Sequence, residues 1–298
     1  MDENVKENIN KNNLGRSIVV AALIIGGALV FTSQSKNINL GAGNPGLTAN
    51  LEKIVLPEKG YVLPVTWGDL GKQMVEPGVI DKQKFENLYN QRGGLDEESR
   101  QLLLGSSNGR LVMTKANSGV LLNLLWGLGL SNKNDILEKS PMTDKRFGGA
   151  GNFASTGGWT LATDQPMNHY SRHAMIPLTA EQQSLVEKVS QNIYRPCCGN
   201  STYFPDCNHG MAMLGLLELM ASQGVGEADI YKAALTVNSF WFPDTYLTIA
   251  RFLAAKGIKW SKMSPQTLLS AEYSSGAGFQ KIQNQVEPIK GGGGSCGV

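Results

Sequence analysis

Residues 118–130, SGVLLNLLWGLGL, place apolar side chains on every face of a helix. A helix that is apolar all round belongs in the interior of a protein or in a membrane. This run is too short to cross a hydrocarbon core about 30 Å thick, which needs about 20 helical residues. We therefore predict that residues 118–130 form the central core helix of a mainly α-helical fold.

Short amphipathic segments, separated by Gly and Pro, lie around this run and predict a helical first half over residues 57–150. The expected helices start at Trp67-Gly68-Asp69-Leu70 and cover residues 81–89, 95–104 and 117–128. Residues 111–114, LVMT, predict a short strand.

The following half, residues 151–273, predicts a helical bundle. Thr179 and Gln182 fit a capping box, and the apolar residues after them keep a helical period as far as Pro196. Further helices are expected over about 210–223, 227–240 and 243–256, with Pro243 in a first turn and Gly224 and Gly257 as helix ends.

Length and charge narrow the functional classes. A chain of 298 residues with 41% hydrophobic composition is globular and can form one or two domains. Its 27 basic and 25 acidic residues nearly balance, and no Lys/Arg stripe is interleaved with aromatic residues. Nucleic acid is therefore not an expected partner. We also find no Gly-x-Ser-x-Gly elbow and no spaced carboxylate pair, so ordinary hydrolysis is not supported, and whether the protein is an enzyme stays open.

A membrane anchor is predicted at residues 17–35, SIVVAALIIGGALVFTSQS, which carry no charge between Arg16 and Lys36. Basic residues in 1–16 favour a cytoplasmic leader and an extracytoplasmic main domain, attached to the cell membrane by a single-pass signal-anchor. A cleaved signal peptide is the alternative that the sequence favours less. Residues 36–56 and 274–298 are rich in Gly, Ser and Asn, and predict a flexible stalk and a flexible tail.

The chemistry is expected in a turn between helices, where residues 195–210 read RPCCGNSTYFPDCNHG. We name Cys197, Cys198, Cys207 and His209 the Cys/His cluster. Thiolates and imidazole suit a thiophilic ion, Cu or Zn, or a metal cofactor. Because adjacent cysteines rarely both turn toward one ion, a site made of Cys207, His209 and either Cys197 or Cys198 is favoured over one using all three cysteines.

Two other interpretations use the same cysteines. A disulfide between Cys207 and Cys197 or Cys198 would be a structural staple, typical of an oxidising compartment. The unpaired thiol left beside it could take part in thiol-disulfide exchange with a redox partner protein. The fourth cysteine, Cys296, lies in the Gly-rich tail and is not expected to join the cluster.

Several neighbouring residues are possible additions to the cluster. His169 and His173 have i, i+4 spacing and would share one face if the segment were helical. Met211 offers a thioether, although core packing is the more ordinary role of a Met in a helix. Asp206 can orient His209 or cap the next helix. Arg195 is either a functional cation or a charge at a helix C-terminus.

Residues 185–243 bear a local resemblance to a known family. A helix, a cysteine turn after Ile-Tyr-Arg, a helix ending in Ser222-Gln223-Gly224, and an aromatic residue before Pro243 resemble the membrane-anchored thiol reductases of cytochrome c maturation. The resemblance implies an extracytoplasmic helical module with thiol chemistry at Cys197, Cys198 or Cys207. The family's Arg-Cys-x-x-Cys motif is replaced here by Arg195-Pro196-Cys197-Cys198, so the departure falls on the redox motif itself.

Overall fold

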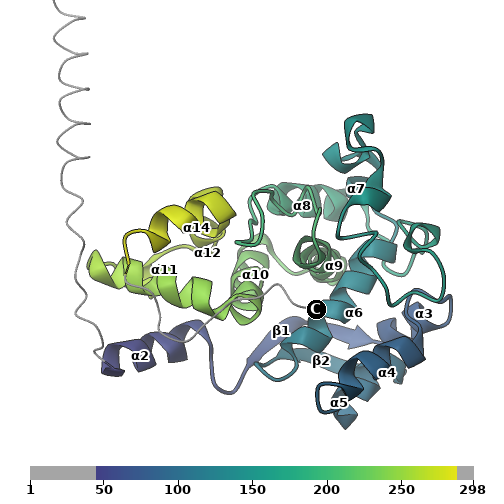
Figure 1. The fold of residues 1–298 in the computed structure, drawn as a ribbon, viewed down its shortest axis with the longest axis horizontal. Helices are drawn as coiled ribbons and strands as arrows, with labels where there is room; N and C mark the ends of the chain where they lie inside the picture. Colours follow the sequence, from purple (N-terminus) through teal and green to yellow (C-terminus); the bar gives the residue numbers. More distant parts are fainter. Residues whose placement is uncertain (1–44, 287–298) are drawn as a thin grey trace, which may run out of the picture. The chain divides into compact units, whose positions relative to one another are not determined.

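The computed structural model describes residues 45–286, with side chains from residue 49, and the described part is mainly α-helical (Figure 1). All of these residues belong to one compact unit. The predicted leader 1–16, the anchor 17–35 and the first part of the predicted stalk, 36–44, lie outside the described residues.

The elements follow one another in a simple order. The first half contains α2 Pro45–Val55, β1 Tyr61–Gly68, α3 Leu70–Val75, α4 Lys82–Asn90, α5 Glu97–Leu104, β2 Asn108–Met113, α6 Ser118–Ser131 and α7 Asp135–Lys139. Short 3-10 turns follow at Pro141–Thr143, Lys145–Phe147, Ala150–Asn152 and Pro166–Asn168. The second half contains α8 Ala180–Ser190, α9 Asn208–Ser222, α10 Glu227–Trp241, α11 Pro243–Ala255, a 3-10 turn at Trp260–Lys262, α12 Pro265–Leu268, α13 Ala271–Ser274 and α14 Gly276–Gln283.

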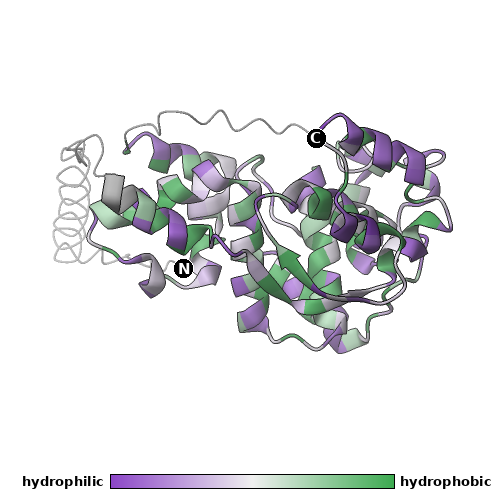
Figure 2. Ribbon diagram, turned by 90° about the horizontal axis from the view of Figure 1, so that it is seen from below, coloured by the Kyte–Doolittle hydropathy of each residue, from purple (hydrophilic) through white to green (hydrophobic). Residues whose placement is uncertain are grey.

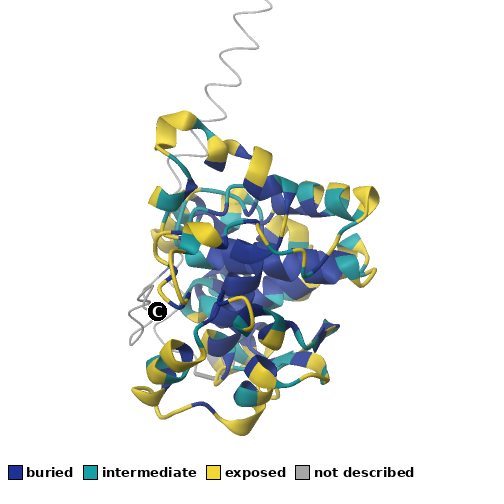
Figure 3. Cartoon of the chain, turned by 90° about the vertical axis from the view of Figure 1, so that its right-hand side faces the viewer, coloured by how far each residue is buried: buried dark blue, intermediate teal, exposed yellow. Residues whose placement is uncertain are grey.

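Helix α6 lies in the core, as predicted, and α9 crosses it at very short range. The crossing point is formed by Gly129 of α6 and Gly215 of α9, because a Cβ on Gly129 would come within 2.8 Å of the Gly215 nitrogen. Residues Val120 to Ser131 of α6 and His209 to Ala221 of α9 are all buried. Buried residues accordingly occupy the middle of the folded part, with exposed residues around them (Figure 3).

The two strands form an antiparallel pair, with Tyr61 opposite Met113 and Gly68 opposite Asn108, although α3, α4 and α5 lie between them in the sequence. Strand β2 confirms the predicted strand, whereas β1 replaces part of the expected helical pattern around Trp67. The side chain of Gln223, at the end of α9, holds β1 by accepting a hydrogen bond from the Thr66 nitrogen (2.8 Å) and donating one to the Thr66 carbonyl (2.7 Å). Hydrophobic residues concentrate on the central helices and strands (Figure 2).

One hydrophobic core includes residues from both predicted halves, so the boundary near residue 150 separates no independent cores. The stalk prediction is wrong from residue 45 onward. Residues 45–55 form α2, which packs against α11 and buries Leu51, Val55 and the following Leu56. The polar composition of the segment concealed this one apolar stripe.

The tail prediction is also wrong for the described residues 274–286. Ser275 caps α14 by accepting a hydrogen bond from the Gly278 nitrogen at 3.0 Å. The glycines allow close packing here rather than disorder, since a Cβ on Gly278 would overlap the Ala271 carbonyl. Residues 287–298, including Cys296, lie outside the described part.

Candidate functional site

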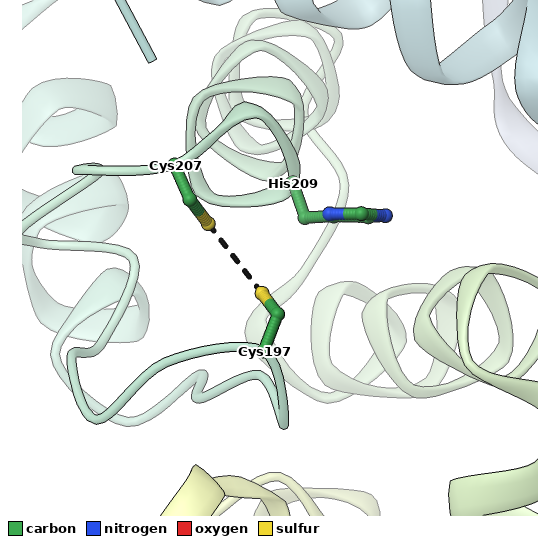
Figure 4. A group of neighbouring side chains, drawn as sticks. All are labelled: Cys197, Cys207 and His209. Carbon is green, nitrogen blue, oxygen red and sulfur yellow. Dashed lines mark hydrogen bonds between the residues drawn. The ribbon is translucent and has the colours of Figure 1, made fainter. Parts of the chain in front are cut away.

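The Cys/His cluster lies between α8 and α9, as the sequence predicts, although α8 ends earlier than expected, at Ser190. Cys197 and Cys198 belong to the connecting turn, Cys207 is the N-cap of α9, and His209 lies in the first turn of that helix. Figure 4 shows the sulfur atoms of Cys197 and Cys207 pointing toward each other, with the ring of His209 to one side of the pair and directed away from it in this view. The three described cysteines are free thiols.

The ligand atoms of three residues converge. Cys197 Sγ lies 3.5 Å from Cys207 Sγ, and one ligand atom from each of Cys197, Cys207 and His209 lies within 4.8 Å of the others. Two sulfurs bound to one tetrahedral ion at bond lengths of about 2.3 Å would be about 3.8 Å apart. The sulfur pair is therefore close to the spacing that a metal requires. A second group, Cys198, Asp206 and Cys207, meets the same distance limit.

The buried side chain of Arg195 makes several hydrogen bonds to the turn. Its side chain is only 1% exposed, and its Nε donates a hydrogen bond to Cys207 Sγ at 3.0 Å. Nη1 donates to the Asn200 carbonyl and Nη2 to the Phe204 carbonyl, both at 3.1 Å. Nη2 also forms an ion pair with Asp206 Oδ1 at 2.6 Å. One guanidinium thus joins the backbone of the turn to the sulfur at the start of α9.

The thiols of the cluster differ in acidity. Hydrogen bonds from Cys197 and Cys198, and then the Arg195 guanidinium, hold the pKa of Cys207 well below its ordinary value. Hydrogen bonds to Cys198 and Cys207, together with burial, raise the pKa of Cys197. The N-terminus of α9 adds to this asymmetry, because Cys207 Sγ accepts a hydrogen bond from the Gly210 nitrogen at 3.4 Å. Cys207 is therefore the more acidic thiol of the pair and Cys197 the less acidic one.

His209 is a buried imidazole in which one ring nitrogen has no hydrogen-bond partner among the described residues. Its side chain is 6% exposed and packs against the rings of Phe242 and Trp241, whose centroids lie 4.4 and 5.7 Å away. Its Nδ1 is buried and has no hydrogen-bond partner among the described residues. Burial lowers the pKa of His209 to about 4, so the ring is neutral at physiological pH and has a lone pair to offer.

Asp206 does not orient His209, in contrast to one of our expectations. Its Oδ1 pairs with Arg195, and its Oδ2 accepts a hydrogen bond from the Asn200 side chain at 2.7 Å. Neither Asp206 nor Asn208 is the N-cap of α9, a role that falls to Cys207. The carboxylate instead fixes the guanidinium, which in turn contacts the sulfur.

His169 and His173 are close together, but not on a helix. They follow the 3-10 turn Pro166–Asn168 in an irregular segment, and neither belongs to the two groups of converging ligands that include the cysteines. Met211 is fully buried in α9 next to the crossing with α6, where its carbonyl would overlap a Cβ on Gly129. Its environment is that of a core residue.

Sequence reasoning did not anticipate two features of the site. The first is the full burial of Arg195. The sequence hint was its position, directly before the cysteine turn and twelve residues before its sulfur partner, Cys207. The second is the contact with the C-terminal region, in which the Gly276 nitrogen donates to the Cys198 carbonyl at 2.8 Å. The Gly-rich composition that predicted a flexible tail is what permits this approach.

No helix in the part of the chain that the structure describes is long and apolar enough to cross a membrane. Comparisons of the chain with protein-family models, with curated proteins and with solved structures found no match in any of the three.

Proposed function

We propose that this protein binds a thiophilic metal ion, copper or zinc, through Cys197, Cys207 and His209. The observation that carries the proposal is the convergence of two sulfurs and an imidazole within 4.8 Å. Cys198 lies next to this set and belongs to the second group with Cys207, which makes it a candidate fourth ligand.

The donor set fits such an ion. Thiolate and imidazole are preferred ligands of Zn(II), and thiolate is preferred by Cu(I). A buried polar atom without a partner costs free energy, and His209 Nδ1 is such an atom. Coordination by this nitrogen would remove that cost. If the protein supplies three ligands, a tetrahedral ion would keep one position for a further ligand.

Arg195 supports the same function through Cys207. A thiolate that ligates a metal keeps lone pairs that can accept hydrogen bonds, and the Arg195 Nε lies 3.0 Å from this sulfur. The guanidinium also favours the deprotonated form of Cys207 before any ion arrives. Metal binding therefore has to displace fewer protons than it would at two ordinary thiols.

We also propose that residues 17–35 tether the chain to the cell membrane, with the metal site on the extracytoplasmic side. The support is the uncharged run itself and the basic residues that precede it. Fusion of a reporter active only outside the cytoplasm to the C-terminus tests the orientation. This fusion is expected to be active. A second fusion, to a reporter that is active only in the cytoplasm, is expected to be inactive.

Elemental analysis of the full-length chain, purified anaerobically, tests metal binding. Cys207→Ser and His209→Ala are expected to lose the ion, whereas Cys198→Ser separates a three-ligand from a four-ligand site. A free-thiol count on the same samples under denaturing conditions checks that the cysteines are reduced. If Cys197 and Cys207 are oxidised to each other and no ion is present, the disulfide staple replaces the metal site.

A second candidate function, thiol-disulfide exchange, is favoured by the unequal acidity of Cys197 and Cys207. In this reaction the Cys207 thiolate attacks a partner disulfide and releases one partner thiolate. Cys197 then gives up its proton and attacks the Cys207 sulfur, which releases the second partner thiolate and leaves a Cys197–Cys207 disulfide. The partner is reduced by two electrons and the protein is oxidised by two.

The resemblance of residues 185–243 to thiol reductases of cytochrome c maturation adds to this second candidate. The two functions are distinguished by His209→Ala, since metal binding requires the imidazole. Exchange chemistry requires only the sulfurs, so the variant should still reduce a model disulfide such as oxidised glutathione, at a changed rate.

A further inference from the structure

The histidine pair, His169 and His173, forms a second cluster of nitrogen ligands outside the Cys/His cluster. His169 Nδ1 lies 3.0 Å from His173 Nε2, and the two rings stack at an interplanar angle of 25°. On the other side of His169, Nε2 lies 2.7 Å from Asp164 Oδ1. His169 is 4% exposed, so this orientation is fixed inside the protein.

The tautomer of His169 follows from these contacts. An ionised Asp164 only accepts hydrogen bonds, so His169 Nε2 carries the hydrogen and Nδ1 presents a lone pair toward His173. Histidines that bind a metal usually donate a hydrogen bond from their other ring nitrogen to a carboxylate or a similar acceptor. The carboxylate fixes the orientation of the ring and raises its basicity. In the structure His173 Nε2 therefore carries a hydrogen and donates it to His169 Nδ1. Metal binding requires the other neutral tautomer of His173, in which the hydrogen lies on Nδ1 and Nε2 presents a lone pair.

The backbone holds the pair in place although the segment is not helical. The Ser171 nitrogen donates to the Leu130 carbonyl (2.9 Å) and the His173 nitrogen to the Ser131 carbonyl (2.9 Å), which ties the segment to the C-terminus of α6. Ser171, between the histidines, has a φ of 54°, which a residue other than glycine rarely adopts. Backbone strain of this kind persists only where the surroundings impose it.

We propose that His169 and His173 bind a divalent transition-metal ion of the class that prefers imidazole, with Zn(II) as its representative, and that Asp164 positions His169. Two nitrogens on one tetrahedral ion at bond lengths of about 2.05 Å would be about 3.3 Å apart. The observed 3.0 Å requires only a slight opening of the pair.

The surroundings suit an ion that keeps water ligands. His173 is partly exposed and Asp164 is exposed, so solvent reaches the outer side of the pair. The C-terminal end of α6, to which the segment is tied, carries partial negative charge.

Zinc titration of the full-length chain against a chromophoric chelator tests this second site. The wild type is expected to bind a second, weaker equivalent of zinc that His173→Asn removes. Asp164→Asn should weaken that equivalent by about tenfold or more, as loss of an orienting carboxylate does at other metal sites.

The Cys/His cluster and the histidine pair can be tested independently of each other. Cys197→Ser/Cys207→Ser should remove the tighter equivalent and keep the weaker one, so failure of the sulfur site leaves the histidine site visible. Because His173 is partly exposed, its replacement by Asn is not expected to prevent folding, which circular dichroism checks. Zinc binding that is identical in the wild type and in His173→Asn would overturn the second site.

Discussion

The guanidinium of Arg195 lies directly against the backbone of Gly210. A Cβ at Gly210 would overlap Cζ of Arg195 and lie 2.7 Å from its Nε, so only glycine allows this contact in the first turn of α9. The same nitrogen of Arg195 reaches Cys207 Sγ. The His-Gly pair at 209 and 210 therefore combines a candidate ligand with the space that the buried cation requires.

Gly210→Ala is expected to displace Arg195 and to destabilise the protein by about 1–3 kcal/mol, the usual cost of forcing an extra carbon into a packed site. Urea unfolding measures the change. Gly119→Ala, near the start of α6, is the matched control, because a Cβ there meets nothing within 4 Å. Equal effects of the two substitutions would argue against the contact.

Arg195→Lys should raise the pKa of Cys207, because Lys keeps the charge but loses the fork that donates simultaneously to sulfur, carbonyls and Asp206. The pH profile of alkylation by iodoacetamide, followed at Cys207 by mass spectrometry, is expected to shift upward by about one unit. Asp206→Asn provides a second variant, which removes the partner of the guanidinium. An unchanged profile in both would mean that Arg195 does not control the thiolate.

Glu218 makes stability depend on pH. It is fully buried in α9, Asn132 donates to its Oε2 at 2.9 Å, and burial raises the pKa of its carboxyl well above 4.5. The native state then binds a proton that the unfolded state has lost, so this contribution to stability is complete below about pH 4.3 and declines as pH rises toward the native pKa.

Glu218→Gln should remove this pH dependence. The stability of the variant relative to the wild type should therefore be higher at pH 8 than at pH 5, by about 1.4 kcal/mol for each pH unit in this interval that lies between the unfolded and native pKa values of Glu218. Thermal unfolding of both proteins at the two pH values measures it. Glu181→Gln, at an exposed position in α8, is the control. A variant that is less stable than the wild type at pH 8 would contradict the assignment of a protonated carboxyl.

The crossing of α6 and α9 predicts a large effect at another glycine. Gly129→Ala would force a Cβ onto the Met211 carbonyl and should destabilise the protein by about 3 kcal/mol, since two backbones must separate. Gly119→Ala, where an added carbon meets nothing within 4 Å, should have little effect. Comparable unfolding midpoints for the two variants would show that the helices can separate at no cost.

Local signals in the sequence were enough to predict the helices of the second half. The capping box of Thr179 and Gln182 forms as expected, and Gly224 and Gly257 follow α9 and α11 with φ values of 74° and 73°. These features depend on a few neighbouring residues. The convergence of Cys197, Cys207 and His209 was also predictable, because one short turn contains all three.

Long-range contacts were not predictable in this way. The burial of Arg195 depends on Gly210 and on the carbonyls of the turn, and α2 is ordered by its packing on α11. Composition gave the opposite expectation for α14, because glycines that allow close packing and glycines that allow disorder look the same in a sequence. The irregular segment around Ser171 likewise brings His169 and His173 together without the helix that their i, i+4 spacing would have required.

The metal content of the anaerobically purified full-length chain, measured together with its Cys207→Ser variant, tests the central claim most directly. We predict a stoichiometric copper or zinc ion in the wild type, its loss in the variant, and reduced Cys197 and Cys207 in the denatured wild type. A wild type without metal after incubation with excess Zn(II) or Cu(I), with both cysteines still reduced, would contradict the proposed metal site.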